Sequence, residues 1–169
     1  TKYYNQLKKD AYMEASSEEV TVVNAASMLT KLLQVSAGAV YTDTQQVIEF
    51  DISNRLTALK EIIQEASHKV IVFCPFRNSI KTLTTELTKL KISNDYINGS
   101  VSMTKRSQIF KNFQEKKNPH VLIIQPQAAS HGVTLHAANV VVFWSPVMSV
   151  ETYIQCCARM DRAGQRNPM

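Results

Sequence analysis

Two unbroken runs of apolar residues, VIVFC at 70–74 and VVVFW at 140–144, constrain the fold more than any other feature of this 169-residue sequence. A strand with one face in solvent alternates apolar and polar side chains, whereas a strand covered on both faces shows no such alternation. The two runs therefore predict strands of a parallel sheet that are buried on both faces, with helices packed on either side.

The chain between and around these two runs has the pattern expected of β-α units. Shorter runs at 95–98 and 120–125 predict two further strands. Amphipathic stretches separate the strands, and we expect helices over 53–66, 79–90, 103–114 and 149–161. The predicted fold class is therefore α/β, with three αβα layers and a mainly parallel sheet.

Residues 1–50 have a different pattern and are predicted to form an N-terminal helical extension that leads into an α/β lobe at 51–169. The extension should contain two amphipathic helices, the second of which ends before Gly38. A small hairpin that pairs 39–41 with 46–50 is expected to follow.

Composition narrows the environment and the class of partner. The net charge of +5 is compatible with an anionic partner such as nucleic acid, but many proteins are equally basic. Three cysteines without a CxxC pair indicate a reducing compartment and predict no metal site. We expect the cytosol of a bacterium or a phage-infected host, or a nucleus if the source is eukaryotic. No run approaches the ~18 apolar residues that span a bilayer, so no membrane partner is expected.

The loops that follow the predicted strands are where a ligand site is expected, because ligands of parallel α/β sheets bind beyond the carboxyl ends of the strands. Three such loops contain polar residues: PFRNS at 75–79, QPQAASHG at 125–132 and SPVMS at 145–149. We expect all three at one edge of the sheet.

The sequence lacks the parts that would hold a nucleoside triphosphate by itself. None of its four glycines begins a GxxxxGK[ST] phosphate loop, and the nearest imitation, at 99–105, lacks the second glycine. No Asp-Glu pair follows a strand to hold magnesium. The chain is therefore not expected to bind a nucleoside triphosphate alone.

The last predicted helix contains Gln155, Arg159 and Arg162, at steps of four and three residues that place them on one stripe. Three residues two positions earlier repeat this spacing and are expected to face the core: Tyr153, Cys157 and Met160. Two arginines this close can converge on one polyphosphate that another part of the protein supplies. The alternative is a solvated helix face with surface arginines.

Residues 155–165, QCCARMDRAGQ, resemble helicase motif VI in the QxxxRxxRxGQ form found in the Swi/Snf-like branch of superfamily-two helicases and translocases. VIVFCPF is similar to motif IV, and INGS with Arg106 resembles the segment that follows it. The stretch 125–146 resembles motif V and its downstream strand, and is closest to viral and prophage members. The resemblance covers nearly the whole chain, with the motifs in the family's order.

This resemblance implies a RecA-like second lobe, ending after motif VI, of a DNA-dependent ATPase. Such enzymes hold ATP with Mg2+ between two lobes, and the phosphate loop and acidic box would belong to an N-terminal lobe of the same polypeptide. The resemblance implies DNA as the partner, with RNA as the alternative, and a monomer. The isolated chain is expected to be inactive as an ATPase. The absence of an initial Met and the stop at RNPM suggest a piece of a longer protein.

The family's motifs also assign roles to individual residues. By position, Arg162 looks like the arginine finger, Arg159 a companion on the phosphates and Gln155 a polar organiser of the same cleft. The remaining residues of the ATP cleft are Gly132, Gly164 and Gln165. Loops that face the nucleic-acid backbone in relatives contain Arg77, Asn78, Gly99, Ser130 and His131.

Three positions depart from the family pattern. Asp161 stands where His is common, Thr134 where Asn or Asp is frequent, and Pro126 begins a pair that replaces Thr-Arg or Ser-Arg. These departures bear on the ribose and inter-motif contacts more than on the arginine pair. A function of a different class, a non-enzymatic α/β module that docks a protein or nucleic acid through a basic face, fits the composition as well.

Overall fold

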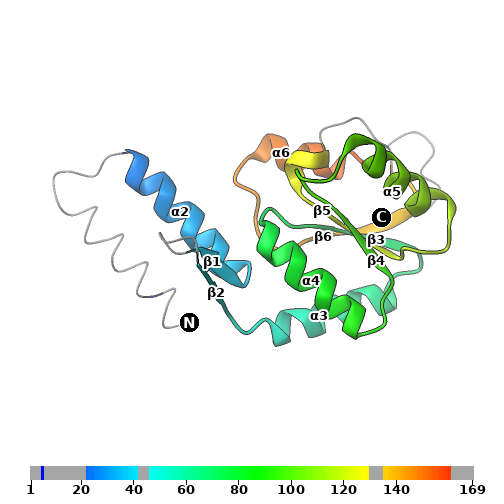
Figure 1. Cartoon of the computed structure of the whole chain (residues 1–169), viewed down its shortest axis with the longest axis horizontal. Coiled ribbons are helices and arrows are strands. Elements are labelled where there is room, and N and C mark those ends of the chain that lie inside the picture. The colour runs from blue at the N-terminus through cyan, green and yellow to red at the C-terminus, as the bar shows by residue number, and fades with distance from the viewer. Residues whose placement is uncertain (1–4, 6–21, 42–45, 130–134, 161–169) are drawn as a thin grey trace. The chain divides into compact units, whose positions relative to one another are not determined.

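The structure, a computed structural model, describes residues 5, 22–41, 46–129 and 135–160 (Figure 1). The chain divides into two compact units, Thr1–Ile52 and Ser53–Met169. No helix in these described ranges is long and apolar enough to cross a membrane.

The first unit contains helix α2 (Val22–Ser36) and a hairpin of strands β1 (Ala39–Tyr41) and β2 (Val47–Glu49). The two strands pair in antiparallel fashion, which confirms the predicted hairpin. Gly38, which joins α2 to β1, has a φ of +101°, and a Cβ added there would lie 2.4 Å from Ile52 Cγ2. Only glycine fits such a turn without strain. The first predicted helix lies outside the described residues, except for one helical residue at position 5.

The second unit alternates strands and helices along the chain. Its elements are α3 (Ser53–Glu65), β3 (Lys69–Phe73), α4 (Arg77–Lys89), β4 (Asn94–Ile97), α5 (Met103–Glu115), β5 (Val121–Ile124), the short 3-10 helix η1 (Pro126–Ala129), β6 (Ala138–Phe143) and α6 (Val150–Cys157). The four strands form one parallel sheet in the order β4-β5-β3-β6. The predicted α/β class is confirmed.

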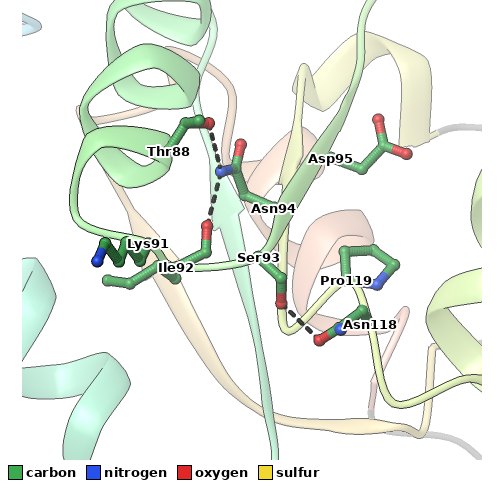
Figure 2. A pocket seen from close by; sticks show the side chains of 8 residues that line it. All are labelled: Thr88, Lys91, Ile92, Ser93, Asn94, Asp95, Asn118 and Pro119. Atoms are coloured by element: carbon green, nitrogen blue, oxygen red, sulfur yellow. Dashed lines mark hydrogen bonds between the residues drawn. The ribbon is translucent and has the colours of Figure 1, made fainter.

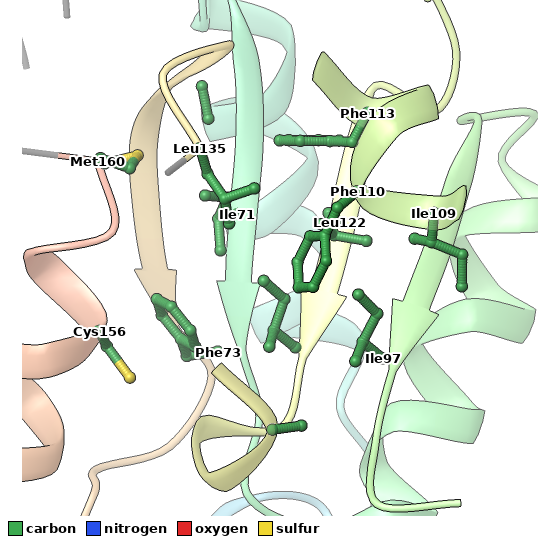
Figure 3. Packing of buried hydrophobic residues seen from close by; sticks show 13 residues of the cluster. Ile71, Phe73, Ile97, Ile109, Phe110, Phe113, Leu122, Leu135, Cys156 and Met160 are labelled. Carbon is green, nitrogen blue, oxygen red and sulfur yellow. The ribbon is translucent and has the colours of Figure 1, made fainter. Parts of the chain in front are cut away.

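Helices cover both faces of this sheet, with α3 and α4 on one side and α5 and α6 on the other (Figure 1). Ile71 and Phe73 of β3 belong to the buried cluster that also includes Phe113 of α5 and Cys156 of α6 (Figure 3). Neighbouring residues of a strand point to opposite faces, so Val70 and Val72 point toward α3 and α4. The unit therefore has the three layers that the sequence predicts.

The two apolar runs occupy different places in the sheet. Strand β3 has a partner on each side, and its residues from Val70 to Phe73 are fully buried. Strand β6 is an edge strand of the described sheet, and its residues 139–143 are only partly buried. The prediction of burial on both faces is right for the first run and wrong for the second, because a local sequence does not fix strand order.

Candidate functional site

Three loops meet at the carboxyl edge of the sheet, where the side chain of Gln125 joins two of them. Its Nε2 donates a hydrogen bond to the carbonyl of Pro75, after β3, at 3.2 Å. Its Oε1 accepts one from the backbone N–H of Gly99, after β4, at 3.0 Å. Gln125 itself follows β5, and its backbone N–H donates to Ile97 at 2.8 Å. The prediction that strand-end loops gather at one edge is confirmed for these described parts.

Arg77 and Gly99, two of the residues expected to face nucleic acid, lie against each other at this edge. A Cβ added to Gly99 would lie 3.2 Å from Arg77 Nη2 and 3.8 Å from Gln125 Oε1. Arg77 is the first residue of α4, and its side chain is exposed. A side chain at position 99 would crowd the guanidinium at its present place, which would have to shift by a few tenths of an ångström. Asn78, the next residue, has a buried Nδ2 with no hydrogen-bond partner among the described residues.

Hydrogen bonds made by Asn98 and Arg106 fix the loop that contains Gly99. Asn98 is buried, and its Oδ1 accepts hydrogen bonds from the backbone N–H and the hydroxyl of Ser100, at 3.0 and 2.7 Å. Arg106 of α5 donates from Nε to Val101 O at 2.8 Å and from Nη2 to Asn98 O at 3.0 Å. Arg106, which the motif comparison singles out, therefore has a structural task in this loop.

Helix α6 differs from the prediction in both length and orientation. It ends at Cys157 and not near 161, so Arg159 follows the helix in a turn. Tyr153, expected to face the core, is 49% exposed, whereas Cys156 is buried. The predicted inward face was wrong for Tyr153: Cys156 is the residue of α6 that is buried, while the Tyr153 ring lies against Phe143 with ring centroids 4.9 Å apart. Met160 does reach the core as expected (Figure 3).

Gln155 lies on the exposed side of α6. Its Nε2 donates to Glu151 Oε1, one turn earlier, at 3.0 Å. The hydroxyl of Ser149 caps the start of the helix by accepting from the N–H of Thr152 at 3.3 Å. Gln155 is thus accessible to a ligand, and its amide oxygen is not used in this hydrogen bond.

Arg159, in the turn after α6, is unusual for an arginine because it is buried, with an exposure of only 8%. Its Nε and Nη1 have no hydrogen-bond partner among the described residues. The backbone is fixed: the carbonyl of Arg159 accepts from the N–H of Leu135 at 2.8 Å. A buried cation without a partner is unfavourable, and an anion that reaches it would remove that penalty.

The buried thiol of Cys156, three residues before Arg159, does not supply this anion. Burial raises the pKa of Cys156 to about 11, with Cys157 raising it further and Arg159 opposing the shift. Cys156 is therefore a neutral thiol near pH 7, since its pKa lies well above that pH.

Six of the residues predicted to form the site lie outside the described residues, and their predicted roles stay predictions. They are Arg162, Gly132, Gly164, Gln165, Ser130 and His131. The departures at Asp161 and Thr134 lie outside them as well.

Two residues at this edge were missed by the sequence analysis. One is Gln125, whose bridging role is visible only once the strand order is known. The other is Arg55 of α3, whose guanidinium lies 4.1 Å from the ring centroid of Trp144 and donates to the carbonyl of Trp144, just after β6. Burial lowers the pKa of Arg55 from its ordinary value. Nothing in the local sequence around Arg55 indicated that it would pair with Trp144, because the two residues are far apart in the chain.

A pocket of about 480 Å³ lies at the opposite, amino edge of the sheet, at the start of β4 (Figure 2). Its polar side chains are used mainly in contacts with one another. Asn94 Nδ2 donates to Thr88 Oγ1 at 3.2 Å and to Ile92 O at 2.9 Å, and Ser93 Oγ donates to Asn118 Oδ1 at 2.8 Å. These contacts fasten the ends of α4, β4 and β5, so we assign the pocket a structural role.

Comparison with known proteins identifies the family to which this chain belongs. The family described as "Helicase conserved C-terminal domain" matches residues 54–164. An uncharacterized ATP-dependent helicase of Mycoplasma genitalium is 26% identical over 167 residues, which are 97% of this chain and 16% of that protein. A Drosophila melanogaster SWI/SNF-related regulator of chromatin, subfamily A-like protein 1, is 30% identical over 115 residues, which are 66% of this chain and 15% of that protein.

A phage relative and a solved structure extend this comparison. A protein of Acyrthosiphon pisum secondary endosymbiont phage 1 is 23% identical over 174 residues, 99% of this chain and 35% of its own length. The Sulfolobus solfataricus SWI2/SNF2 ATPase core, solved in complex with dsDNA, has a TM-score of 0.65 and 17% identity, covering 84% of this chain and 31% of that chain. The chain thus spans only about a sixth to a third of the length of these curated relatives.

Proposed function

Because the chain belongs to the helicase conserved C-terminal domain family, and is Swi/Snf-like within it, we propose that it is the second motor lobe of an ATP-driven, DNA-dependent translocase or helicase. In this proposal an N-terminal lobe of the same polypeptide carries the phosphate loop and binds most of the ATP and Mg2+. The present lobe supplies positive charge to the phosphates from the turn that follows α6.

The observation that carries the proposal is the buried side chain of Arg159, whose Nε and Nη1 have no hydrogen-bond partner among the described residues. A chain that folded for structure alone would gain by pairing this charge or replacing it with an apolar residue. A guanidinium matches the geometry of phosphate oxygens, to which it can donate two parallel hydrogen bonds. A triphosphate is therefore the kind of partner that this position fits.

The roles within the lobe follow from this placement. Arg159 would donate to the phosphate oxygens from the turn after α6, and Arg162, three residues on, would reach the terminal phosphate as the arginine finger. Gln155, exposed on α6, would orient groups of the same cleft. ATP supplies the free energy of hydrolysis, and an arginine placed on the transferred phosphoryl group accelerates that reaction by ~10³ to 10⁵.

DNA contact is proposed at the loops that Gln125 joins. Arg77 has an exposed guanidinium with no hydrogen bond to another described residue, and it lies beside the backbone of Gly99. Asn78 would contribute from the same turn, with Ser130 and His131 from the neighbouring loop. The dsDNA complex of the archaeal ATPase core, which shares this fold, supports nucleic acid as the partner.

The test is ATP hydrolysis by the full-length polypeptide that contains this lobe. We expect Arg162→Ala to lower the DNA-stimulated turnover by ~10³ or more, with folding unchanged. Lys111→Ala, which removes an exposed cation from α5, is the matched control and should retain activity. The 169-residue chain alone should show no turnover.

Two results would contradict the proposal. One is a turnover by the isolated chain comparable to that of a full-length motor. The other is full activity in Arg162→Ala, which would favour the alternative of a non-enzymatic module that binds protein or nucleic acid through a basic face.

A further inference from the structure

Among the described residues, the side chain of Gln125 is the only hydrogen-bonded link between the loops after β3 and β4. Gln125 directly follows β5, which lies between β3 and β4 in the sheet, so its side chain can reach the loops on both sides. Its two hydrogen bonds, to Pro75 O and from Gly99 N–H, use one donor and one acceptor of the same amide.

The chemistry of this link requires an amide of this length. A carboxamide has a donor and an acceptor on one planar group, whereas an ionised carboxylate only accepts and an ammonium only donates. Serine and threonine hydroxyls can both donate and accept, but their side chains are too short to reach the loops of both neighbouring strands, each about 4.8 Å away. Gln125 is therefore suited to set the distance between these two loops.

That distance controls where the guanidinium of Arg77 lies. Pro75 is two residues before Arg77, and Gly99 is the residue whose missing side chain leaves room for Arg77 Nη2. If the link were lost, the strand ends would stay paired through the hydrogen bonds from Cys74 N–H to Ile124 O and from Gln125 N–H to Ile97 O. The loop residues Pro75 and Gly99 would no longer be tied together, and Arg77 would lose its defined position over Gly99.

We propose that Gln125 is a positioning residue for nucleic-acid binding: it holds the loops after β3 and β4 together so that Arg77 is fixed for contact with one phosphodiester group. This inference rests on the proposed function. Gln125 does not touch the nucleic acid itself and acts through Arg77. Fixing the guanidinium in advance reduces the conformational entropy lost when the phosphate binds.

The experiment is a double-mutant cycle on the affinity of the full-length polypeptide for a short labelled DNA duplex. Gln125→Met keeps the length and packing of the side chain and removes only its hydrogen bonds. Arg77→Ala should weaken binding about tenfold in the wild-type background but only about twofold in the Gln125→Met background. Gln64→Ala, an exposed glutamine of α3, is the matched control and should leave affinity and the Arg77→Ala effect unchanged.

The salt dependence of binding gives a second measurement, which a merely structural role of Gln125 would not change. Losing one phosphate contact reduces the slope of log affinity against log salt by about one. We expect this reduction in Arg77→Ala and most of it in Gln125→Met, at unchanged melting temperature. Gly99→Ala, which leaves the link intact but crowds Arg77, should weaken binding in the same direction and keeps the test valid if Gln125→Met folds poorly.

The outcomes separate this inference from the proposed function. If the wild-type polypeptide does not bind DNA, the proposed function fails and this inference fails with it. If the wild type binds DNA but Gln125→Met and Gly99→Ala bind equally well, and Arg77→Ala has its full effect in both, only the positioning role is overturned.

Discussion

Lys69 and Arg159 are two cations of the same lobe, and the fold uses their hydrogen-bond donors differently. At the amino edge of the sheet, Lys69 Nζ donates to the carbonyls of Phe113 and Lys116, each at 2.5 Å, and lies 4.9 Å from the Phe113 ring centroid. In the turn after α6, Nε and Nη1 of Arg159 have no partner among the described residues. A cation whose donors the fold already uses is structural, whereas a buried cation with unused donors remains available to a ligand.

The position of Lys69 explains its structural role. The two carbonyls belong to the end of α5, where a helix has unpaired carbonyl groups and a partial negative charge. The ammonium satisfies both. Burial lowers the pKa of Lys69, but two charge-assisted hydrogen bonds offset the cost of partial desolvation.

The largest stability effect that we predict is at Lys69. Lys69→Met should lower the free energy of unfolding by about 2 kcal/mol, because two carbonyls at the end of α5 lose a charged donor. Urea unfolding followed by circular dichroism measures this change. Lys81→Met, at an exposed position of α4, is the control and should change stability by less than about 0.5 kcal/mol. Equal effects at the two positions would remove the structural role of Lys69.

The second prediction concerns pH and asks whether a cysteine thiolate could be the anion that pairs with Arg159 inside the lobe. Burial raises the pKa of Cys74 to about 12 and that of Cys156 to about 11. An unfolded cysteine titrates near ~8.5, so both thiols contribute stability that is fully present below that pH. This contribution is lost as the pH rises from ~8.5 toward the folded values, because the unfolded chain releases protons first.

Denaturant unfolding at about pH 8 and about pH 9 measures this loss, which we expect to be about 1 to 2 kcal/mol for the two thiols together. The double variant Cys74→Ala, Cys156→Ala should show a smaller loss over the same range, although its stability at the lower pH will be reduced by the cavities. A slope that is identical in wild type and double variant would mean that the thiols do not remain protonated. Cys156 would then be a candidate partner for Arg159, and the contrast with Lys69 would weaken.

What the sequence could predict is the part of the molecule that depends on local pattern. The run KVIVFC predicts strand β3 at Lys69–Phe73 almost to the residue, since an unbroken apolar run has few other places in an α/β fold. The helices α3, α4 and α5 begin and end within two residues of their predicted ranges. Their amphipathic periodicity is long enough to fix both the helix type and its boundaries.

What the sequence could not predict depends on contacts between distant segments. Gln125 follows a strand like many other polar residues, and its link to Gly99 and Pro75 exists only because β5 lies between β4 and β3. The early end of α6 at Cys157 was missed because residues 150–163 contain no glycine or proline that would mark the end of a helix. The burial of Arg159 follows from that early end, so the same error hid the most informative side chain of the site.

The smallest effect that we predict is the change in the free energy of unfolding caused by Arg159→Met. It separates the two cations most clearly, because Lys69→Met should lower this free energy and Arg159→Met should not. Arg159→Met replaces a buried, unpartnered charge by an apolar side chain of similar length, so the free energy of unfolding should stay the same or rise by about 1 kcal/mol. The same urea unfolding that measures Lys69→Met measures this change. ATP hydrolysis by the full-length polypeptide should nevertheless fall steeply in Arg159→Met, whereas Lys69→Met should retain the wild-type rate per folded molecule.

A loss of more than about 2 kcal/mol in Arg159→Met would mean that the guanidinium already has a partner within the chain. In that case Arg159 would be a structural cation like Lys69, and the unused donors that support a triphosphate beside the end of α6 would no longer be available.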